Sequence, residues 1–211
     1  MKSRKIIFLD IDGVLNSSDF DDHCRKEYWL DPPTEEILDA EAIMTLRYIV
    51  DQTGAEVVMS SSWREYPEAK WKAIMLLDLY GVQVVDSTPI LPGPRQWDYR
   101  NNEIKAWLDQ HPEVTNYLIL DDLPMTYAEQ ARHQVLTTMQ KGLLREHADK
   151  AIQILNEGDE GDEKPVRVPL DRETEKWFNA HPDYVATVRQ CKDCGLFYNP
   201  ELRHRCEKEE K

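Results

Sequence analysis

The chain has 211 residues, of which 41% are hydrophobic and 31% charged, so it can bury the core of one ordinary domain and is not disordered throughout. Its formal net charge is −14, and this charge lies entirely in residues 1–164, because residues 165–211 hold nine basic and nine acidic residues. Such an acidic main part argues against the basic surface of a general nucleic-acid-binding protein. No apolar run is long enough for a membrane span and no signal peptide is recognisable, so we expect a cytoplasmic protein.

Short apolar segments alternate with stretches of helical periodicity in the first three quarters of the chain. Strands are predicted at 6–9, 56–59, 82–85, 117–120 and, more weakly, 133–136. Helices are predicted at 40–52, 67–80, 101–109 and 144–155. Strands that are apolar without alternation indicate a parallel sheet covered on both faces. The predicted fold class is therefore α/β, a three-layer Rossmann-like sandwich.

The composition changes at residues 157–164, a run of acidic residues and glycines with one lysine. Such a segment has nothing to bury and predicts a solvated linker. It separates a main domain at 1–156 from a small C-terminal module at 165–211.

Polar side chains follow three of the predicted strands, and a cation stands near the start of one helix. These residues are Asp10 and Asp12, Ser60 and Ser61, Asp121 and Asp122, and Arg100. In open parallel sheets, ligands bind beyond the carboxyl ends of the strands. We therefore expect these side chains to converge on one edge of the sheet.

Four carboxylates at one edge would repel one another unless a cation lay between them. Oxygen ligands of this kind suit Mg²⁺. Hydroxyl groups and an arginine beside the cation fit the negative oxygens of a phosphoryl group, which the acidic main domain would otherwise repel. The sequence thus predicts a magnesium-dependent phosphate site.

Residues 8–16 (FLDIDGVLN) resemble the first motif of the haloacid-dehalogenase-like (HAD) phosphohydrolases, and residues 57–60 (VVMS) resemble their second motif. Further segments are similar to the branch named for a HAD domain in Swiss Army Knife RNA-repair proteins. They are residues 61–64 (SSWR), 100–108 (RNNEIKAWL), 120–122 (LDD) and 142–143 (GL). The resemblance covers about residues 5–156 and leaves the C-terminal module out.

The resemblance implies a role for each carboxylate. Asp10 would be the nucleophile that forms an aspartyl-phosphate, and Asp12 the general acid and then the general base. Mg²⁺ would be held by the Asp10 carboxylate, the Asp12 backbone carbonyl and Asp121, with Asp122 binding directly, through water, or only orienting a neighbour.

The resemblance also implies a set of phosphate-binding groups. Ser60 would donate a hydrogen bond to the phosphoryl group, either alone or with Ser61 or Ser62, unless those two serines only satisfy the loop backbone. The cation that holds the phosphate is Arg100 or Lys105, and Arg100 matches the branch better. Arg64 is either a second phosphate contact or an ordinary arginine at the start of a helix.

Only small insertions are available to cover this site. Residues 16–38 are predicted to form a flap and residues 87–99 a loop, so the cap is minimal and the site open. The aromatic residues Trp29, Trp97 and Tyr99 either stack on a base or sugar or pack the flap onto the sheet.

The C-terminal module contains a candidate structural zinc site. Two cysteines three residues apart resemble a zinc knuckle, and a histidine and a third cysteine stand further along. The four candidate ligands are Cys191, Cys194, His204 and Cys206. The alternative is a reduced tail that binds no Zn²⁺.

These expectations lead to one functional prediction with two rivals. The prediction is a magnesium-dependent phosphomonoester hydrolase that acts on nucleotides or small phosphorylated metabolites. The first rival removes a terminal phosphate from RNA or DNA during end-healing. The second, of another class, is a noncatalytic binding module whose tail recruits a protein partner; its weakness is that binding alone does not require both Asp10 and Asp12.

Overall fold

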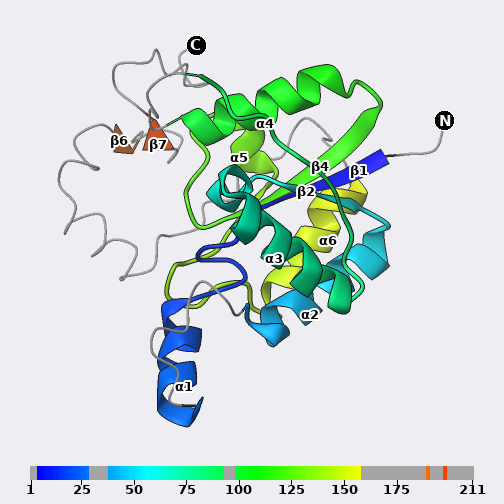
Figure 1. The fold of residues 1–211 in the computed structure, drawn as a ribbon. Helices are drawn as coiled ribbons and strands as arrows, with labels where there is room; N and C mark the ends of the chain where they lie inside the picture. Colours follow the sequence, from blue (N-terminus) through cyan, green and yellow to red (C-terminus); the bar gives the residue numbers. More distant parts are fainter. Residues whose placement is uncertain (1–3, 29–37, 93–97, 158–188, 191–196, 199–211) are drawn as a thin grey trace.

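The computed structural model describes residues 4–28, 38–92, 98–157, 189–190 and 197–198. Its centre is a parallel sheet of five strands in the order β3-β2-β1-β4-β5 (Figure 1). The strands are β1 (Arg4–Leu9), β2 (Glu56–Met59), β3 (Val84–Ser87), β4 (Val114–Asp121) and β5 (Gln134–Leu136). This arrangement confirms the predicted α/β fold.

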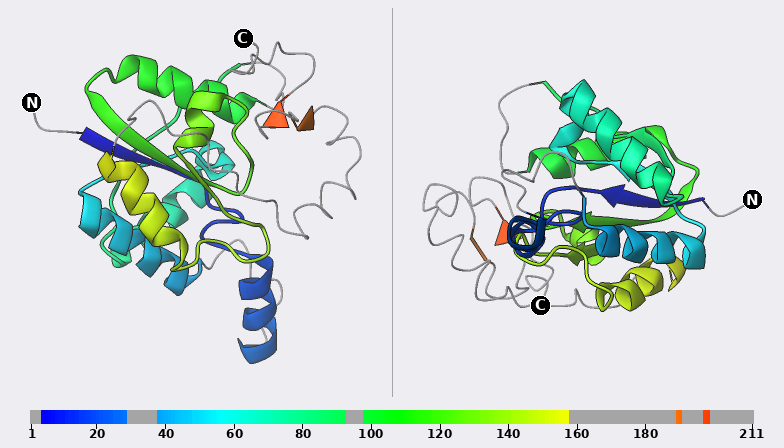
Figure 2. Two further views of the ribbon diagram at one scale, coloured as in Figure 1. Left: turned by 180° about the vertical axis from the view of Figure 1, so that it is seen from behind. Right: turned by 60° about the horizontal axis from the view of Figure 1, so that its bottom comes forward.

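Helices cover both faces of the sheet. The helices of the main domain are α1 (Ser18–Tyr28), α2 (Ala40–Thr53), α3 (Pro67–Leu79), α4 (Tyr99–Gln110), α5 (Ala128–Arg132) and α6 (His147–Glu157). The larger apolar core joins the sheet to α2, α3 and α6, and the smaller one joins it to α4. Figure 2 shows α2 and α6 side by side, across the sheet from α4.

Alternate residues of β1 enter the two cores. Ile7 and Leu9 contribute to the core with α2, whereas Ile6 and Phe8 contribute to the core with α4. All four are completely buried, which explains why the strand is apolar at every position rather than at every second one. Because β1 lies between β2 and β4, a residue at its carboxyl end is surrounded by both neighbouring strands.

The ends of α2 agree with the sequence. The Asp39 carboxylate accepts a hydrogen bond of 2.9 Å from the Glu41 amide and caps the helix, and Gly54 ends it in the left-handed conformation with φ +67°. The apolar residues of α3 are not all buried, because Leu77 is fully buried whereas Trp71 is 63% exposed. α3 follows β2 and leads to the edge strand β3, so less of its surface is covered by the sheet.

Several predicted boundaries were wrong by a few residues, and two helices were missed. The third strand begins at Val84 rather than at residue 82, and α4 begins at Tyr99, which places Arg100 inside the helix. Helix α1 occupies residues predicted to form a flap and extends away from the sheet (Figure 1). It has too few apolar residues for a helical period to be read, and α5 is too short for one.

The C-terminal predictions lie almost wholly outside the described residues. The exceptions are Glu157, which ends α6, and the antiparallel pair β6 (Arg189–Gln190) and β7 (Phe197–Tyr198). The zinc candidates Cys191, Cys194, His204 and Cys206, and the aromatic residues Trp29 and Trp97, are not among the described residues. Within the described ranges, no helix combines the length and the hydrophobicity that a membrane crossing requires.

Candidate active site

Two neighbouring strands bring Asp10 and Asp121 together. Leu9 of β1 pairs with Leu120 of β4, and the Asp10 amide continues the ladder with a 2.9 Å hydrogen bond to the Leu120 carbonyl. Asp10 therefore follows β1 at the level where Asp121 ends β4. Both residues are buried, so their carboxylates depend on partners at the edge of the sheet.

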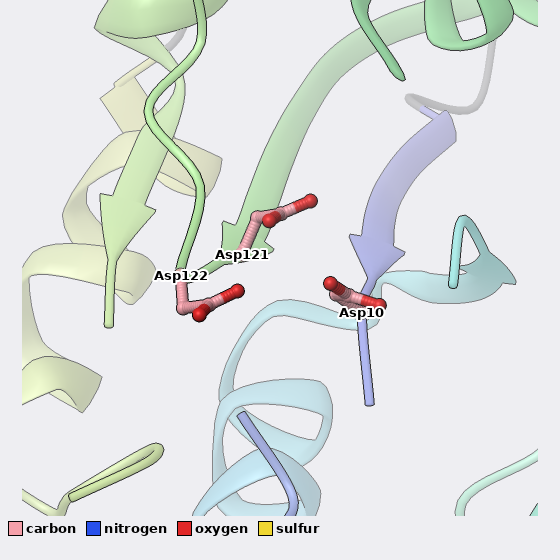
Figure 3. Close-up of side chains that lie close together, drawn as sticks. All are labelled: Asp10, Asp121 and Asp122. Atoms are coloured by element: carbon pink, nitrogen blue, oxygen red, sulfur yellow. The ribbon is translucent and has the colours of Figure 1, made fainter. Parts of the chain in front are cut away.

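Asp122 completes a cluster of three carboxylates (Figure 3). One carboxylate oxygen from each of Asp10, Asp121 and Asp122 lies within 4.8 Å of the others. Two oxygens that each bind one Mg²⁺ at about 2.1 Å are at most about 4.2 Å apart, so the three carboxylates lie at or close to the spacing that a shared ion requires. The chemistry of the donors and their spacing fit a hard divalent cation. The Asp12 carboxylate is not part of this cluster.

Gly13 allows Asp122 to approach the loop that follows β1. Its backbone has φ +69°, and a Cβ atom at this position would lie 2.6 Å from Cγ of Asp122. Gly142 also approaches this loop closely, because a Cβ at this position would lie 2.8 Å from the Val14 carbonyl oxygen. A side chain at position 13 would therefore clash with Asp122, and one at position 142 would clash with the loop backbone.

Arg100 is the cation that the structure brings to the carboxylates. Its Nη1 lies 2.9 Å from Oδ2 of Asp121 and 3.2 Å from Oδ1 of Asp10, and its side chain is 4% exposed. Burial lowers the pKa of Arg100, but the negative charges of Asp10 and Asp121 outweigh burial and raise it well above its ordinary value. Lys105 instead pairs with Asp109 one turn further along α4, where its side chain is 52% exposed.

The two serines after β2 lie differently. Ser60 is fully buried, and within the described part of the structure its Oγ has no hydrogen-bond partner. Ser61 caps the short 3-10 helix that follows, because its Oγ accepts a 3.3 Å hydrogen bond from the Trp63 amide. Ser60 therefore retains a free donor, whereas Ser61 satisfies loop backbone.

Asp12 is held by two side chains that the sequence did not single out for a role. Nε1 of Trp63 donates a 3.0 Å hydrogen bond to Oδ2 of Asp12, and Nδ2 of Asn16 donates a 2.9 Å hydrogen bond to Oδ1. Each carboxylate oxygen thus has its own donor, which limits rotation of the group. Asn16 and Trp63 both lie inside the segments that resemble the family's motifs, and this position is the signal by which the sequence could have indicated them.

Arg64 is neither a phosphate contact nor an ordinary arginine at the start of a helix. Its guanidinium donates to the backbone carbonyls of Ser60, Ser61, Thr88 and Pro89, and it forms a buried ion pair with Glu103 of α4. An arginine has five N–H donors, and these contacts use all of them. Arg64 therefore has no donor left for a phosphate and instead joins three segments around the site.

β5 supports the site from the side opposite to β2. The Thr137 hydroxyl donates to the Gly13 carbonyl at 2.6 Å. The Gln134 side chain donates to the Leu123 carbonyl and accepts from the Met125 amide, so it holds the loop that follows Asp122. Sequence reasoning missed both residues, because Gln134 lies inside the weakest predicted strand and Thr137 directly follows that strand.

Burial changes the protonation of the carboxylate cluster. Burial raises the pKa of Asp121 to about 7, with a contribution from Asp10 that Arg100 opposes. Burial also raises the pKa of Asp122 to about 8, and the charges of Asp121 and Asp10 add to the effect. The cluster therefore retains protons near neutral pH unless a bound metal ion takes their place.

We expect the cation-free protein to lose stability as pH rises from about 4 to about 8. The unfolded chain releases the protons of these carboxyl groups near pH 4, whereas the folded chain still binds them. Each such proton changes the free energy of unfolding by about 1.4 kcal/mol per pH unit in this window. Urea unfolding in chelator at several pH values measures the slope.

The Asp122→Asn variant isolates this contribution from those of other groups. His147 is one such group, because burial lowers its pKa and stability therefore rises with pH as it loses its proton. The wild-type protein should lose more stability than the variant between pH 5 and 8, and Mg²⁺ should stabilise it more at pH 8 than at pH 6. Equal slopes for the two proteins would contradict the raised pKa values.

The fold and the carboxylate site together define a haloacid-dehalogenase-like domain, in which an Asp-x-Asp-Gly loop and a pair of aspartates meet at the carboxyl ends of parallel strands. The profile of the family described as "HAD domain in Swiss Army Knife RNA repair proteins" matches residues 6–148. The chain belongs to this family, as its motifs indicated. No curated protein and no solved structure matches the chain.

Proposed function

We propose that this protein is a magnesium-dependent phosphomonoester hydrolase that acts through an aspartyl-phosphate. The observation that carries the proposal is the buried cluster of Asp10, Asp121 and Asp122 with Arg100 paired to two of them. A purely structural cluster would not need three carboxylates beside a serine whose hydroxyl has no partner among the described residues. Membership of the HAD family supports a hydrolase.

In the first step, the Asp10 carboxylate attacks phosphorus in line with the ester oxygen. Oδ1 of Asp10 accepts a 2.8 Å hydrogen bond from the Ile11 amide and pairs with Arg100, so the group is held before substrate binds. A bond forms between an Asp10 oxygen and phosphorus, and the bond from phosphorus to the ester oxygen breaks. Asp12 gives its proton to the departing alkoxide, and Ser60 and Arg100 contact the phosphoryl oxygens.

In the second step, water hydrolyses the aspartyl-phosphate. Asp12, now ionised, accepts a proton from water while the water oxygen attacks phosphorus, which releases inorganic phosphate and restores Asp10. Asp10, Asp121, Asp122 and the Asp12 carbonyl would hold Mg²⁺. The bound ion would reduce the repulsion between the Asp10 carboxylate and the phosphate and would stabilise charge on the phosphoryl oxygens.

A nucleotide or another small phosphorylated metabolite is the proposed substrate. The support is electrostatic: residues 1–164 carry 31 acidic and 17 basic residues, which disfavours a long phosphate backbone. Helices α1 and α2 are the described helices between Asp12 and β2, and α2 packs on the sheet, so α1 is the described part of a small cap. A phosphorylated RNA or DNA end is the second candidate, and its support is the description of the family as a domain of RNA repair proteins.

Phosphate release from a panel of esters tests the proposal. The panel holds nucleoside monophosphates, sugar phosphates and oligonucleotides with a 3′- or 5′-phosphate, each with Mg²⁺ and with chelator. We expect turnover that chelator abolishes, and nucleoside monophosphates should be preferred. Preference for oligonucleotide ends, with affinity that falls steeply as salt is added, would identify a polynucleotide end rather than a small metabolite as the substrate. No release from any ester by folded, metal-bound protein would favour a noncatalytic binding module instead.

A further inference from the structure

We propose that the buried ion pair of Arg64 and Glu103 is a positioning device that sets the distance between the two phosphate-binding groups, Ser60 and Arg100. The inference rests on the proposed function. Ser60 follows β2, and Arg100 lies in the first turn of α4, a helix that packs on the other face of the sheet from α2. These two elements are far apart in the sequence, so a tertiary contact must hold their side chains in register.

The contacts of Arg64 hold the loop that contains Ser60. Its Nη1 donates to the carbonyl oxygens of Ser60 and Ser61, both at 2.6 Å. Its Nε donates at 3.0 Å to the carbonyl of Thr88, in the segment that follows β3. Arg64 thus fixes the backbone of Ser60 against the neighbouring strand end, and its charge requires a buried partner.

Glu103 supplies that partner from α4. The side chains of Arg64 and Glu103 are 1% and 3% exposed, so water does not screen the pair. Glu103 lies three residues after Arg100, which places both side chains on the same side of the helix. The second carboxylate oxygen of Glu103 accepts a 3.4 Å hydrogen bond from the Leu91 amide. Through this pair, the loop of Ser60 is tied to the turn of α4 that carries Arg100.

The Arg64–Glu103 pair joins two segments that each carry a hydrogen-bond donor without a partner among the described residues. Ser60 Oγ and Arg100 Nε are buried, and neither has a hydrogen-bond partner within the described residues. Buried donors without partners are costly, and a phosphate that accepted from both would remove the cost. The benefit depends on their separation, because a hydrogen bond weakens steeply once its distance or angle leaves the normal range.

The test compares binding of inorganic phosphate, in the presence of Mg²⁺, by wild type and variants. The main variant, Arg64→Met with Glu103→Leu, removes both charges and leaves neither one buried alone. We expect its dissociation constant for phosphate, from calorimetry and from competitive inhibition, to rise about tenfold to a hundredfold, the effect of losing one hydrogen bond to a charged group. KM for the ester should rise with it, while the Mg²⁺ concentration for half-saturation changes less than about threefold. Glu103→Gln keeps an acceptor for Arg64 and should lie between this variant and wild type.

A core variant on the far side of the protein controls for loss of stability. Leu155 of α6 is completely buried, and a 2.7 Å hydrogen bond from Lys5 to Asn156 places this end of α6 near the start of β1, away from the site. Leu155→Ala should lower the melting temperature without changing phosphate affinity. Equal loss of affinity in this control, or unchanged affinity in the double variant, would overturn the positioning role alone. Wild-type protein that neither binds phosphate nor hydrolyses any ester would instead overturn the proposed function, and the positioning role with it.

Discussion

Replacement of Asp10 by asparagine should lower phosphate release by about 10⁴-fold or more. The amide has nearly the same shape and can still accept the hydrogen bond from the Ile11 amide, but it is a far weaker nucleophile toward phosphorus. Stability should not fall, because the change removes one negative charge from a cluster of three and leaves Arg100 its partner Asp121. Phosphate release with Mg²⁺ measures the first effect, and thermal unfolding in chelator, where no bound ion contributes, measures the second.

The same variant identifies the covalent intermediate. Wild-type protein quenched in acid during turnover of a phosphate-labelled substrate should retain label on the protein, whereas Asp10→Asn should retain none. Asp109→Asn is the matched control, because Asp109 is exposed and pairs with Lys105 on the same helix. It should keep full activity. More than about a tenth of wild-type activity in Asp10→Asn would show that another group attacks phosphorus.

Replacement of Asp12 by asparagine should slow hydrolysis of alkyl phosphates by about 10²- to 10⁴-fold. An alkoxide is a poor leaving group and needs the proton of Asp12 as it departs, whereas p-nitrophenolate leaves without one. With p-nitrophenyl phosphate, the first step should therefore remain fast and the second should be slow, because water then lacks its general base. Rapid-mixing kinetics should show a burst of one p-nitrophenolate per protein, followed by slow turnover.

An exposed aspartate of α1 provides the control for this experiment. Asp22→Asn removes the same charge from an exposed position of the same part of the chain, and it should leave both substrates unaffected. Equal slowing of the alkyl and the p-nitrophenyl ester by Asp12→Asn, with no burst, would exclude Asp12 as the acid and base. Trp63 and Asn16 would then only stabilise the loop that follows β1.

The sequence by itself determined the sheet and the place of its carboxylates. A strand that is buried on both faces must be apolar at every position, so β1, β2 and β4 stand out wherever they occur. The end of such a strand lies at the edge where ligands bind, and this rule placed Asp10 and Asp121 beside each other. The ends of α2 likewise depend on local sequence, because Asp39 and Gly54 act on their own helix.

Only the tertiary structure decided which side chains complete the site. Arg100 and Lys105 stand on the same helix five residues apart, and only the packing of α4 beside β4 turns Arg100 toward Asp10 and Asp121. The roles of Arg64 and Trp63 likewise depend on partners 39 and 51 residues away in the sequence. Local periodicity reports which face of an element is apolar. It carries no information about the polar group that another element will bring to a given side chain, because that partner is determined by how the elements pack.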